Sequence, residues 1–331
     1  MSRVVVIGGG VIGCAAAERL TLDGHQVTLL ERDQLGAHAS GAAAGELSPS
    51  ALASGEQALG MFPEVVTRIE KDSGLNVEYR SQQGLRPAFT PQEAEQLKTG
   101  EGRWLDAREC RQTEPSLSSD VLGAMLLEHA HLTPPRFVRA LARAAASRGA
   151  AIREGTPAIG FALEDHELRS VKTPAESIDA DWVVVAAGPW TREVSAAAGV
   201  DVDVRPQRGQ LAALDPGSLA LRGSIFWSNG YLVPKGDGTI IAGGTEEDAG
   251  FDDRPTAEGI ASLLTFAQKL VPALAKASLE RVWAGLRPVM RDGKPIVAIS
   301  EVRNLIVATG HHRKGILLAP LAAAQIADLI S

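Results

Sequence analysis

The amino end of the chain alternates between an unbroken apolar run, a run of glycines and a helical spacing of apolar residues. After its first residue, Arg3–Ile7 is all Val or Ile, which predicts a strand buried on both faces, as in a parallel sheet. Val11–Leu22 then has the pattern of a helix that ends before Gly24, and residues 26–31 predict a second strand. The segment is therefore expected to form a βαβ unit.

The same apolar style returns further along the chain. The elements predicted in this style are a helix at 133–148, buried strands at 150–153, 181–187 and 305–308, and an apolar helix at Gly315–Ile330. Thr133 is expected to cap the first of these helices, with proline in the first turn.

Other parts of the chain have a different character, with short strand-like pieces between polar segments. The predicted strands there are 76–80, 85–90, 121–127, 210–214, 224–227, 231–234 and 239–242, and the accompanying helices are 54–71, 91–100 and 257–270. Because the two styles interleave along the chain, we expect two domains that are each discontinuous in sequence.

The composition is that of an ordinary globular protein and favours two domains, with 331 residues of which 45% are apolar and 22% charged. The net charge of −7 gives no support for binding to nucleic acid or to a membrane surface. No apolar stretch reaches the roughly 18 residues of a membrane span, and glycines interrupt the one run that resembles a signal peptide. Cys14 and Cys110 have neither metal-ligand nor disulfide spacing, so we expect free thiols in a cytoplasmic protein.

Glycines between the first strand and the first helix match the G-x-G-x-x-G pattern of dinucleotide-binding sites. Gly8 allows the tight turn, Gly10 lets the backbone approach a pyrophosphate, and Gly13 lets the helix pack closely on the strand. The helix N-terminus at Val11 and Ile12 can then bind the phosphates through free N–H groups and the helix dipole.

The residues that follow narrow the choice of nucleotide. Glu31 stands at the end of the second predicted strand, where an acid accepts hydrogen bonds from a ribose hydroxyl and disfavours a 2′-phosphate. This argues against NADP but does not separate NAD from FAD. Residues 37–45 are small and polar, so they can run closely along a large flat cofactor, with Ser40 offered to its phosphates. A flexible loop is the alternative interpretation of that segment.

Blocks spread over nearly the whole chain resemble the D-amino-acid oxidase superfamily of flavoproteins, and most of all its glycine oxidases. The blocks are the opening glycines with Glu31, residues 40–45, VVVAAGPW at 183–190, YLVP at 231–234, WAGLRP at 283–288, DGKP at 292–295 and ATGHHRKGILLAP at 308–320. The GLRP block and the GHHRKGILLAP ending are the features most similar to glycine oxidase.

This resemblance implies an α/β fold in which a Rossmann-like FAD-binding domain with a parallel sheet is joined to a substrate domain with a mainly antiparallel sheet. The FAD-binding domain is expected in residues 1–72, 130–203 and 284–331, and the substrate domain in residues 73–129 and 204–283. The last helix is expected to direct its N-terminus at the flavin, where backbone N–H groups stabilise the negative charge of the reduced ring.

FAD is expected to be bound non-covalently. The residues that should bind it are Gly8, Gly10, Val11, Ile12, Gly13, Glu31, Arg32, Ser40, Ala42, Ala43, Ala44, Gly45, Ala158, Ala187, Gly188, Trp190, Arg287, His311, His312, Arg313, Lys314, Gly315, Ile316 and Leu317. Among these, the resemblance places Ala158 at the adenine, and the strand end at Ala187 and Gly188 near the ADP half of the cofactor.

An amino-acid substrate carries a carboxylate, for which the planar fork of an arginine is the natural receptor. The resemblance gives this role to Arg287, gives Tyr231 a hydrogen bond to the same carboxylate, and places Arg313 at the rim of the active site. A surface ion pair is the alternative for Arg287, packing in the sheet for Tyr231, and a strand-end cap or a solvated position for Arg313.

Two candidate pocket residues depart from the family pattern. Asn229 stands where glycine oxidases usually have His, and Glu246 stands where a hydrophobic residue would line the pocket. Glu246 either faces solvent or binds an amine or a cationic side chain. These departures put glycine itself in question more than they affect the expectation of amine oxidation.

The expected reaction is hydride transfer from the α-carbon of a small amino acid to FAD, followed by hydrolysis of the imino acid to an α-keto acid and ammonia. Dioxygen is the expected electron acceptor, and the resemblance suggests a role in making the thiazole part of thiamine. A dehydrogenase for a quinone or carrier protein, an oxidase of secondary or larger amines, an NAD-binding reductase and a non-enzymatic flavin-binding module are the alternatives. Homo-oligomers are possible, and no metal is expected, because His129, His131, His311 and His312 lack metal-ligand spacing.

Overall fold

The computed structural model describes residues 1–49, 52–100 and 102–331. The chain divides into two compact units. The first unit contains residues 1–79, 132–207 and 286–331, and the second contains residues 80–131 and 208–285.

The first unit is built on a mostly parallel sheet with the strand order β17-β18-β11-β1-β2-β7. The strands are β1 (Arg3–Ile7), β2 (Gln26–Leu30), β7 (Ala151–Arg153), β11 (Trp182–Val185), β17 (Ile296–Ile299) and β18 (Leu305–Thr309). Every pairing is parallel except that of β17 with β18. Val5 and Val183 are register partners and are fully buried, as the unbroken apolar runs predicted.

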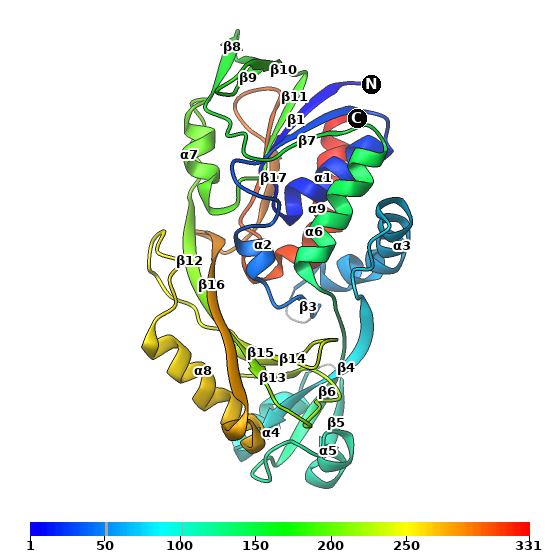
Figure 1. The fold of residues 1–331 in the computed structure, drawn as a ribbon, viewed down its shortest axis with the longest axis vertical. Helices are drawn as coiled ribbons and strands as arrows, with labels where there is room; N and C mark the ends of the chain where they lie inside the picture. The colour runs from blue at the N-terminus through cyan, green and yellow to red at the C-terminus, as the bar shows by residue number, and fades with distance from the viewer. Residues whose placement is uncertain (50–51, 101) are drawn as a thin grey trace. The chain divides into compact units, whose positions relative to one another are not determined.

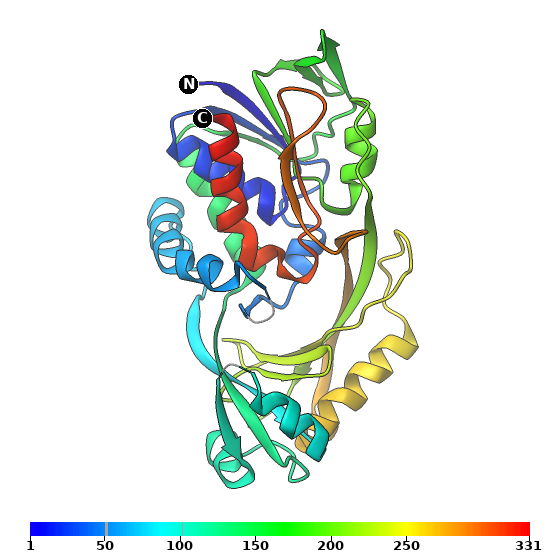
Figure 2. The ribbon, with the colours of Figure 1, turned by 180° about the vertical axis from the view of Figure 1, so that it is seen from behind.

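Four long helices belong to this unit: α1 (Val11–Leu22), α3 (Gly55–Ser73), α6 (Pro134–Ser147) and α9 (Gly315–Ile330). Helix α1 packs against α6 and α9, and these three helices lie side by side in Figure 1. Helix α3 packs against α6 and α9, and its contact with α9 is seen from behind in Figure 2. Glu18 of α1 is buried in this layer, where Arg68 and Arg148 neutralise its carboxylate through hydrogen bonds.

The opposite side of the parallel sheet packs against a small antiparallel sheet that the sequence pattern did not predict. Its strands are β8 (Gly160–Glu164), β9 (Glu167–Lys172) and β10 (Ser177–Asp179), in the order β10-β9-β8. Phe161 and Leu168 share one core with Val5 and Val183 of the large sheet. The unit also contains α2 (Ala39–Ala42), β3 (Glu46–Leu47) and α7 (Thr191–Ala196).

The second unit is built on a mainly antiparallel sheet with the order β16-β12-β15-β14-β13-β4-β6, to which β5 adds by pairing with β6. The strands are β4 (Arg80–Ala88), β5 (Arg103–Asp106), β6 (Gly123–His131), β12 (Val204–Asp215), β13 (Ile225–Trp227), β14 (Gly230–Pro234), β15 (Ile240–Gly243) and β16 (Ser278–Met290). The pairing of β13 with β4 is parallel. Strands β12 and β16 begin in one unit and end in the other.

The two faces of this sheet differ in what packs on them. On one face, Leu232 and Ala242 form a core with residues of helices α5 (Ala107–Thr113) and α8 (Ala257–Leu270). The segment just before helix α4 (Pro91–Lys98) packs against the same core. We call this the helix face. Side chains alternate along a strand, so the register partners Phe226, Tyr231 and Gly243 lie on the opposite face. We call that the Tyr231 face.

Two local predictions were wrong. Residues 76–79 form a turn instead of a strand, because the Asn76 side chain accepts a hydrogen bond from the Glu78 N–H and Glu78 has a φ of 60°. Strand β4 begins only at Arg80, where pairing with β6 starts. Thr133 precedes α6, but its hydroxyl donates to Glu78 and makes no capping bond to the helix.

Among the described residues, no helix is both long enough and apolar enough to cross a membrane. Cys14 and Cys110 are buried free thiols, as predicted. Burial raises the pKa of the Cys110 thiol to about 11 and raises that of Cys14 further, so both are protonated and unreactive at neutral pH.

Candidate functional site

The carboxyl ends of four neighbouring parallel strands meet at one edge of the first unit's sheet. Strand β1 leads into Gly8, β2 into Glu31, β11 into Ala187 and β18 into His311. Ligands of open α/β sheets bind at this edge, outside the strand ends. The parallel pairings therefore bring together four of the predicted cofactor-binding segments that lie far apart in the sequence.

The glycine turn is so tightly packed that side chains are excluded from it. Gly8 has a φ of +111°, and a Cβ there would lie 2.4 Å from the carbonyl oxygen of Ala186. A Cβ on Gly13 would lie 1.9 Å from the carbonyl oxygen of Gly8, so helix and strand could not approach as they do. At Gly10 a Cβ would meet only the Ser40 hydroxyl, at 3.3 Å. The turn needs glycine at 8 and 13 to fold, whereas Gly10 leaves space above the backbone.

Glu31 is buried, and its carboxylate accepts hydrogen bonds from the Gly9 N–H at 2.6 Å and from the Asp33 N–H at 2.8 Å. The carboxylate thus ties the glycine turn to the end of β2. An ionised carboxylate has about four acceptor positions, so two remain for a ribose hydroxyl. Gly9 was not predicted to be a site residue, although a Cβ there would lie 2.9 Å from the Glu31 side chain.

A cation–π contact joins two of the predicted cofactor-binding residues. The Arg32 guanidinium lies 4.0 Å from the ring centre of Trp190, which follows β11. His38 packs on the same indole, with ring centroids 4.6 Å apart, and its Nε2 lies 2.7 Å from Asp33. Hydrogen bonding to His38 lowers the pKa of the Asp33 carboxyl, against an opposing effect of desolvation. Arg32, which directly follows Glu31 in the chain, and His38 thus both contact the Trp190 ring.

The segment after His38 places both backbone groups and the Ser40 side chain near the N-terminus of α1. The Ser40 hydroxyl accepts a hydrogen bond from the Val11 N–H at 2.9 Å, which places it at the N-terminus of α1. Ala42 and Ala43 are half-buried and Ala44 is buried. Gly45 has a φ of +87° and is excluded from carrying a side chain by the Leu132 carbonyl, 2.0 Å from a Cβ. A close crossing of two backbone segments thus requires Gly45, whether or not it binds a cofactor.

Ala158 and Gly188 also lie near this edge. The Thr156 N–H donates to the Glu31 carbonyl at 2.8 Å, so half-buried Ala158, two residues further along the chain, lies near the end of β2. Gly188 has a φ of 56°, and its carbonyl accepts a hydrogen bond from Thr309 at 2.9 Å. That bond ties the end of β11 to the end of β18.

The segment between β18 and α9 is rich in polar side chains. His311 is buried, its Nδ1 has no hydrogen-bond partner among the described residues, and burial lowers its pKa to about 4. His312 donates from Nε2 to Gln207 at 2.6 Å, and Lys314 donates to the Ser48 carbonyl at 2.7 Å. Nothing in the spacing of the sequence pointed to Gln207 or Ser48.

Helix α9 begins at Gly315 with no side-chain capping bond. The N–H groups of the first turn, which includes Ile316 and Leu317, therefore have no side-chain acceptor at the N-cap. Such a helix end stabilises negative charge. Half-buried Arg313 lies one turn before it, in the short 3-10 helix at His312–Lys314.

The proposed substrate-binding residues fall in both units. Arg287 is half-buried on the part of β16 that belongs to the first unit, as is Arg313. Tyr231, Asn229 and Glu246 belong to the second unit. Tyr231 is half-buried, and its ring lies against Gly243, where a Cβ would be 2.6 Å from ring atoms. Asn229 and Glu246 are exposed, the first in the turn between β13 and β14 and the second just after β15.

Within the described part of the chain, one group of side chains has ligand atoms close enough together to hold a metal ion. Ligand atoms of Glu31, Asp33 and His38 lie within 4.8 Å of one another. Glu31 already accepts two backbone N–H groups, and Asp33 is paired with His38 and Arg32. These contacts account for all three side chains, so the absence of a metal stays a prediction.

The first-unit edge fits a dinucleotide in several independent respects. The glycine turn leaves open backbone above Gly10, Glu31 keeps free acceptor positions, and α9 presents an uncapped N-terminus. His311 adds a buried nitrogen that has no partner among the described residues.

Comparisons with known proteins agree with this site. The sequence profile of the family described as FAD dependent oxidoreductase (DAO) matches residues 3–329. The bifunctional protein ThiO/ThiG of Trichormus variabilis is 36% identical over 99% of this chain, which spans 52% of that relative's length. A glycine oxidase of Geobacillus kaustophilus is 32% identical over 99% of this chain and 92% of its own.

A crystal structure of a glycine oxidase from Bacillus cereus has the same fold, with a TM-score of 0.93 and 31% identity, and the alignment covers 100% of this chain and 95% of that one. The profile and the relatives cover both units of the chain. The chain spans about half the length of the ThiO/ThiG relatives that it matches. It belongs to the DAO family of FAD-dependent oxidoreductases, and FAD is its cofactor.

Proposed function

We propose that this protein oxidises a small amino acid, namely glycine, sarcosine or a short D-amino acid, at the α-carbon with dioxygen as electron acceptor. The observation that carries the proposal is its likeness to glycine oxidases over the full length of both units. The structure supports it with Arg287, which is half-buried on β16, and with Tyr231, which is half-buried on the Tyr231 face.

In this proposal, Arg287 binds the substrate carboxylate through two parallel hydrogen bonds, and Tyr231 donates a third to the same group. Arg313 holds the rim position that the family resemblance gives it. A fixed carboxylate leaves the α-carbon with one orientation, so positioning supplies most of the rate enhancement and no dedicated acid or base is needed.

Bound FAD would accept the hydride from the α-carbon and pass two electrons to dioxygen, which yields hydrogen peroxide. The substrate amine must be neutral for this transfer, and water then hydrolyses the imino acid to an α-keto acid and ammonia, or methylamine where the substrate is sarcosine. The uncapped N-terminus of α9, at Gly315, Ile316 and Leu317, is the part of the chain proposed to stabilise negative charge on the reduced ring.

The cellular role is a separate part of the proposal. The ThiO/ThiG relatives carry further sequence beyond the part that this chain matches. The family resemblance supports a role in making the thiazole part of thiamine. We propose a cytoplasmic protein, in accordance with the buried free thiols.

A peroxide assay across glycine, sarcosine, short D-amino acids and a basic D-amino acid tests the proposal. We expect peroxide and α-keto acid in equal amounts with a small neutral substrate. Turnover with a quinone or artificial acceptor but without peroxide would identify a dehydrogenase instead. Turnover limited to amines larger than these small substrates would identify the alternative oxidase of larger amines, and no reduction of the bound flavin by any of the amines would refute the proposal.

A further inference from the structure

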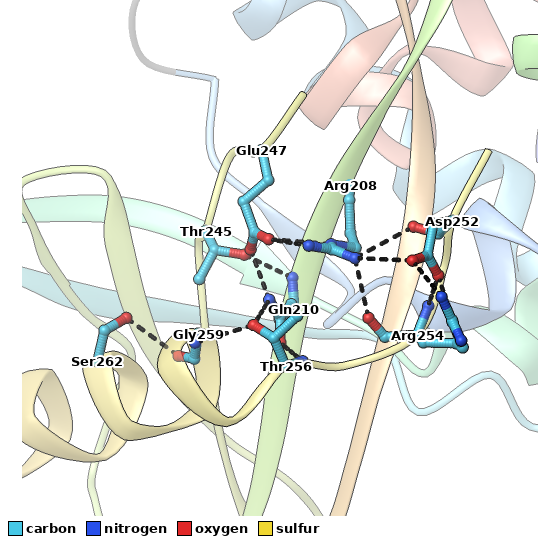
Figure 3. Close-up of polar contacts among 9 residues, drawn as sticks. All are labelled: Arg208, Gln210, Thr245, Glu247, Asp252, Arg254, Thr256, Gly259 and Ser262. Carbon is cyan, nitrogen blue, oxygen red and sulfur yellow. Dashed lines mark hydrogen bonds and ion pairs between the residues drawn. The ribbon is translucent and has the colours of Figure 1, made fainter. Parts of the chain in front are cut away.

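A group of buried and half-buried polar side chains joins β12 to the segment that follows β15, on the helix face of the second unit (Figure 3). It consists of Arg208 and Gln210 on β12 and of Thr245 and Glu247 beyond β15, and we call these four residues the polar clasp. Arg208 is 8% exposed and Gln210 is fully buried. Buried polar groups of this kind are costly unless they are paired, and Arg208 and Gln210 both have partners within the same unit.

Arg208 is the centre of the clasp. Its Nε and Nη2 donate to the Glu247 carboxylate at 2.9 and 2.6 Å, and its Nη1 donates to the Arg254 carbonyl at 3.1 Å. Burial raises the pKa of the Glu247 carboxyl, but hydrogen bonds from Arg208, Gln210 and Thr245 outweigh that effect, so the pKa lies below its ordinary range. Glu247 is therefore ionised, and the guanidinium fixes the segment after β15 at two points.

Gln210 connects the same segment to helix α8. Its side-chain amide donates to Glu247 at 2.7 Å and to the Thr256 hydroxyl at 3.0 Å, and its side-chain oxygen accepts the Thr256 N–H at 2.8 Å. Thr256 in turn caps α8 by accepting the Gly259 N–H. The Gln210 backbone N–H donates to the Thr245 hydroxyl at 2.7 Å, so a side chain takes the place of a strand carbonyl.

The replacement of that carbonyl marks an irregularity in the sheet. Leu211 pairs with Gly243, whereas Arg208 pairs with Glu247 through two backbone hydrogen bonds of 2.9 Å. Between these two pairs, β12 contributes only residues 209 and 210, and the opposite segment contributes residues 244, 245 and 246. One extra residue against a regular strand is a β-bulge, which redirects the side chains that follow it.

The bulge decides which of two consecutive glutamates faces α8. Without the extra residue, Glu247 would share a face with Gly243 and Tyr231, because side chains alternate with a period of two. With it, Glu247 pairs with Arg208 on the helix face, and alternation of side chains from Glu247 assigns exposed Glu246 to the Tyr231 face.

The bulged segment also supports the residues proposed to meet substrate. The Tyr231 ring lies against Gly243, and a Cβ on Gly244 would lie 2.4 Å from the Asn229 carbonyl oxygen. Gly244 has a φ of +126°, a conformation that other residues avoid. The clasp therefore holds residues 243 and 244 from the helix face. On the opposite face, the same two residues contact the Tyr231 ring and the β13–β14 turn.

We infer that the polar clasp is a positioning device for substrate recognition: it locks the bulge after β15, and so fixes the Tyr231 ring and presents Glu246 on the Tyr231 face. The inference rests on the proposed function, because Tyr231 is a proposed carboxylate ligand. None of the four clasp residues is proposed to touch substrate or FAD. They act through Gly243 and Gly244.

The first test compares Thr245→Val, which keeps the shape of the side chain but removes the acceptor for the Gln210 N–H, with Thr245→Ser, which keeps the hydroxyl. Thr265→Val is the matched control, since Thr265 is an exposed residue of α8 whose hydroxyl bonds only within its own helix. We expect Thr245→Val to raise KM for the amino acid by about tenfold, to change kcat by less than about threefold and to keep full flavin content. Thr245→Ser should restore KM, and Thr265→Val should match the wild type.

Glu247→Gln provides a second variant, because it keeps the shape of the side chain and removes only the charge that pairs with Arg208. It should raise KM in the same way and weaken binding of acetate, used as a carboxylate probe and followed by the flavin spectrum. Unchanged KM and unchanged acetate binding in both Thr245→Val and Glu247→Gln would overturn the inference.

Amide hydrogen exchange in peptides covering residues 229–247 separates this inference from the proposed function. If the wild type oxidises none of the amino acids, the proposed function fails, but the exchange experiment still tests the clasp. Faster exchange around Tyr231 and Gly243 in Thr245→Val, with wild-type rates in Thr265→Val, supports a positioning device. Wild-type exchange there in both clasp variants would contradict it.

Discussion

Arg287 is the residue on which the proposed substrate recognition depends most directly, because a guanidinium can bind a carboxylate through two parallel hydrogen bonds and an ammonium cannot. We expect Arg287→Lys to lower kcat/KM by about 10- to 100-fold, which corresponds to the roughly 1.5–3 kcal/mol of a hydrogen bond to a charged group. Steady-state kinetics with the best substrate measures the effect.

The control for this prediction is Arg291→Lys. Arg291 follows the same strand, but its side chain is 88% exposed, so the same exchange should leave kcat/KM unchanged. Equal kinetics for Arg287→Lys and wild type, within a factor of about two, would place the carboxylate-binding residue elsewhere.

His129 gives a prediction about acid stability. The side chain is 2% exposed, Gln82 donates to its Nε2 at 3.3 Å, and its Nδ1 has no partner among the described residues. Burial, reinforced by the neighbouring His131, lowers its pKa to about 4. The unfolded chain binds this proton from about pH 6.5 downward, and the folded chain binds it only near pH 4. The free energy of unfolding must therefore fall as the pH drops from 6.5 towards 4.

For His129 alone this linkage amounts to about 2 kcal/mol at pH 5 relative to neutral pH. His129→Gln should remove it, so that the difference in unfolding free energy between pH 7.5 and pH 5 shrinks by that amount in urea titrations. His166→Gln, at an exposed turn, controls for the loss of a histidine. His311 is also buried with a lowered pKa, so part of the acid sensitivity should persist in the variant.

At the scale of elements, glycines in the β1–turn–α1 segment have two different roles: one is needed for folding, and another leaves space for the cofactor. Gly13 is needed for folding, because a Cβ there would collide with the Gly8 carbonyl. Gly10 has a φ of −75°, which any residue adopts, and a Cβ would meet only the flexible Ser40 hydroxyl. We therefore expect Gly10→Ala to keep the stability of the apoprotein and to lose FAD affinity, because the added methyl group blocks the pyrophosphate.

Titration of apoprotein with FAD, together with urea unfolding, measures both quantities. Gly13→Ala should lose stability as well as affinity. Gly60→Ala is the control: this glycine lies inside α3 with nothing near its Cβ position, so the change should stabilise the helix by up to about 1 kcal/mol. Wild-type FAD affinity in Gly10→Ala would contradict the assignment of the turn to the pyrophosphate.

At the scale of the whole molecule, FAD should act as a reversible stabilising ligand. No His or Cys of the sequence matches a flavin-linkage position of the family, so acid precipitation should release all of the flavin into the supernatant. Colour retained in the pellet would show a covalent bond. Free FAD at 100 times its Kd should raise the unfolding free energy by about 2.7 kcal/mol, and this gain should vanish when the cofactor is removed.

The sequence by itself determined the parts of this protein that depend on neighbours along the chain. The βαβ opening, the glycine turn with Glu31 and the buried strands all follow from local spacing, and the structure has them within a few residues of the predicted bounds. A strand inside a parallel sheet is buried on both faces and is therefore an unbroken apolar run. A pyrophosphate binds to exposed backbone N–H groups, which glycines provide. Both features can be recognised in a short stretch of sequence.

Only the tertiary structure decided the features that depend on pairing between distant strands. Strand β4 runs over Arg80–Ala88 because β6 pairs with all of it, although its residues alternate irregularly in polarity. Nothing near Arg208 in the sequence points to Glu247, and nothing in two consecutive glutamates shows that a bulge will turn one to each face. The register between strands is set by the whole sheet. The pairing of Arg208 with Glu247 and the burial of His129 therefore follow from the tertiary structure and not from local sequence.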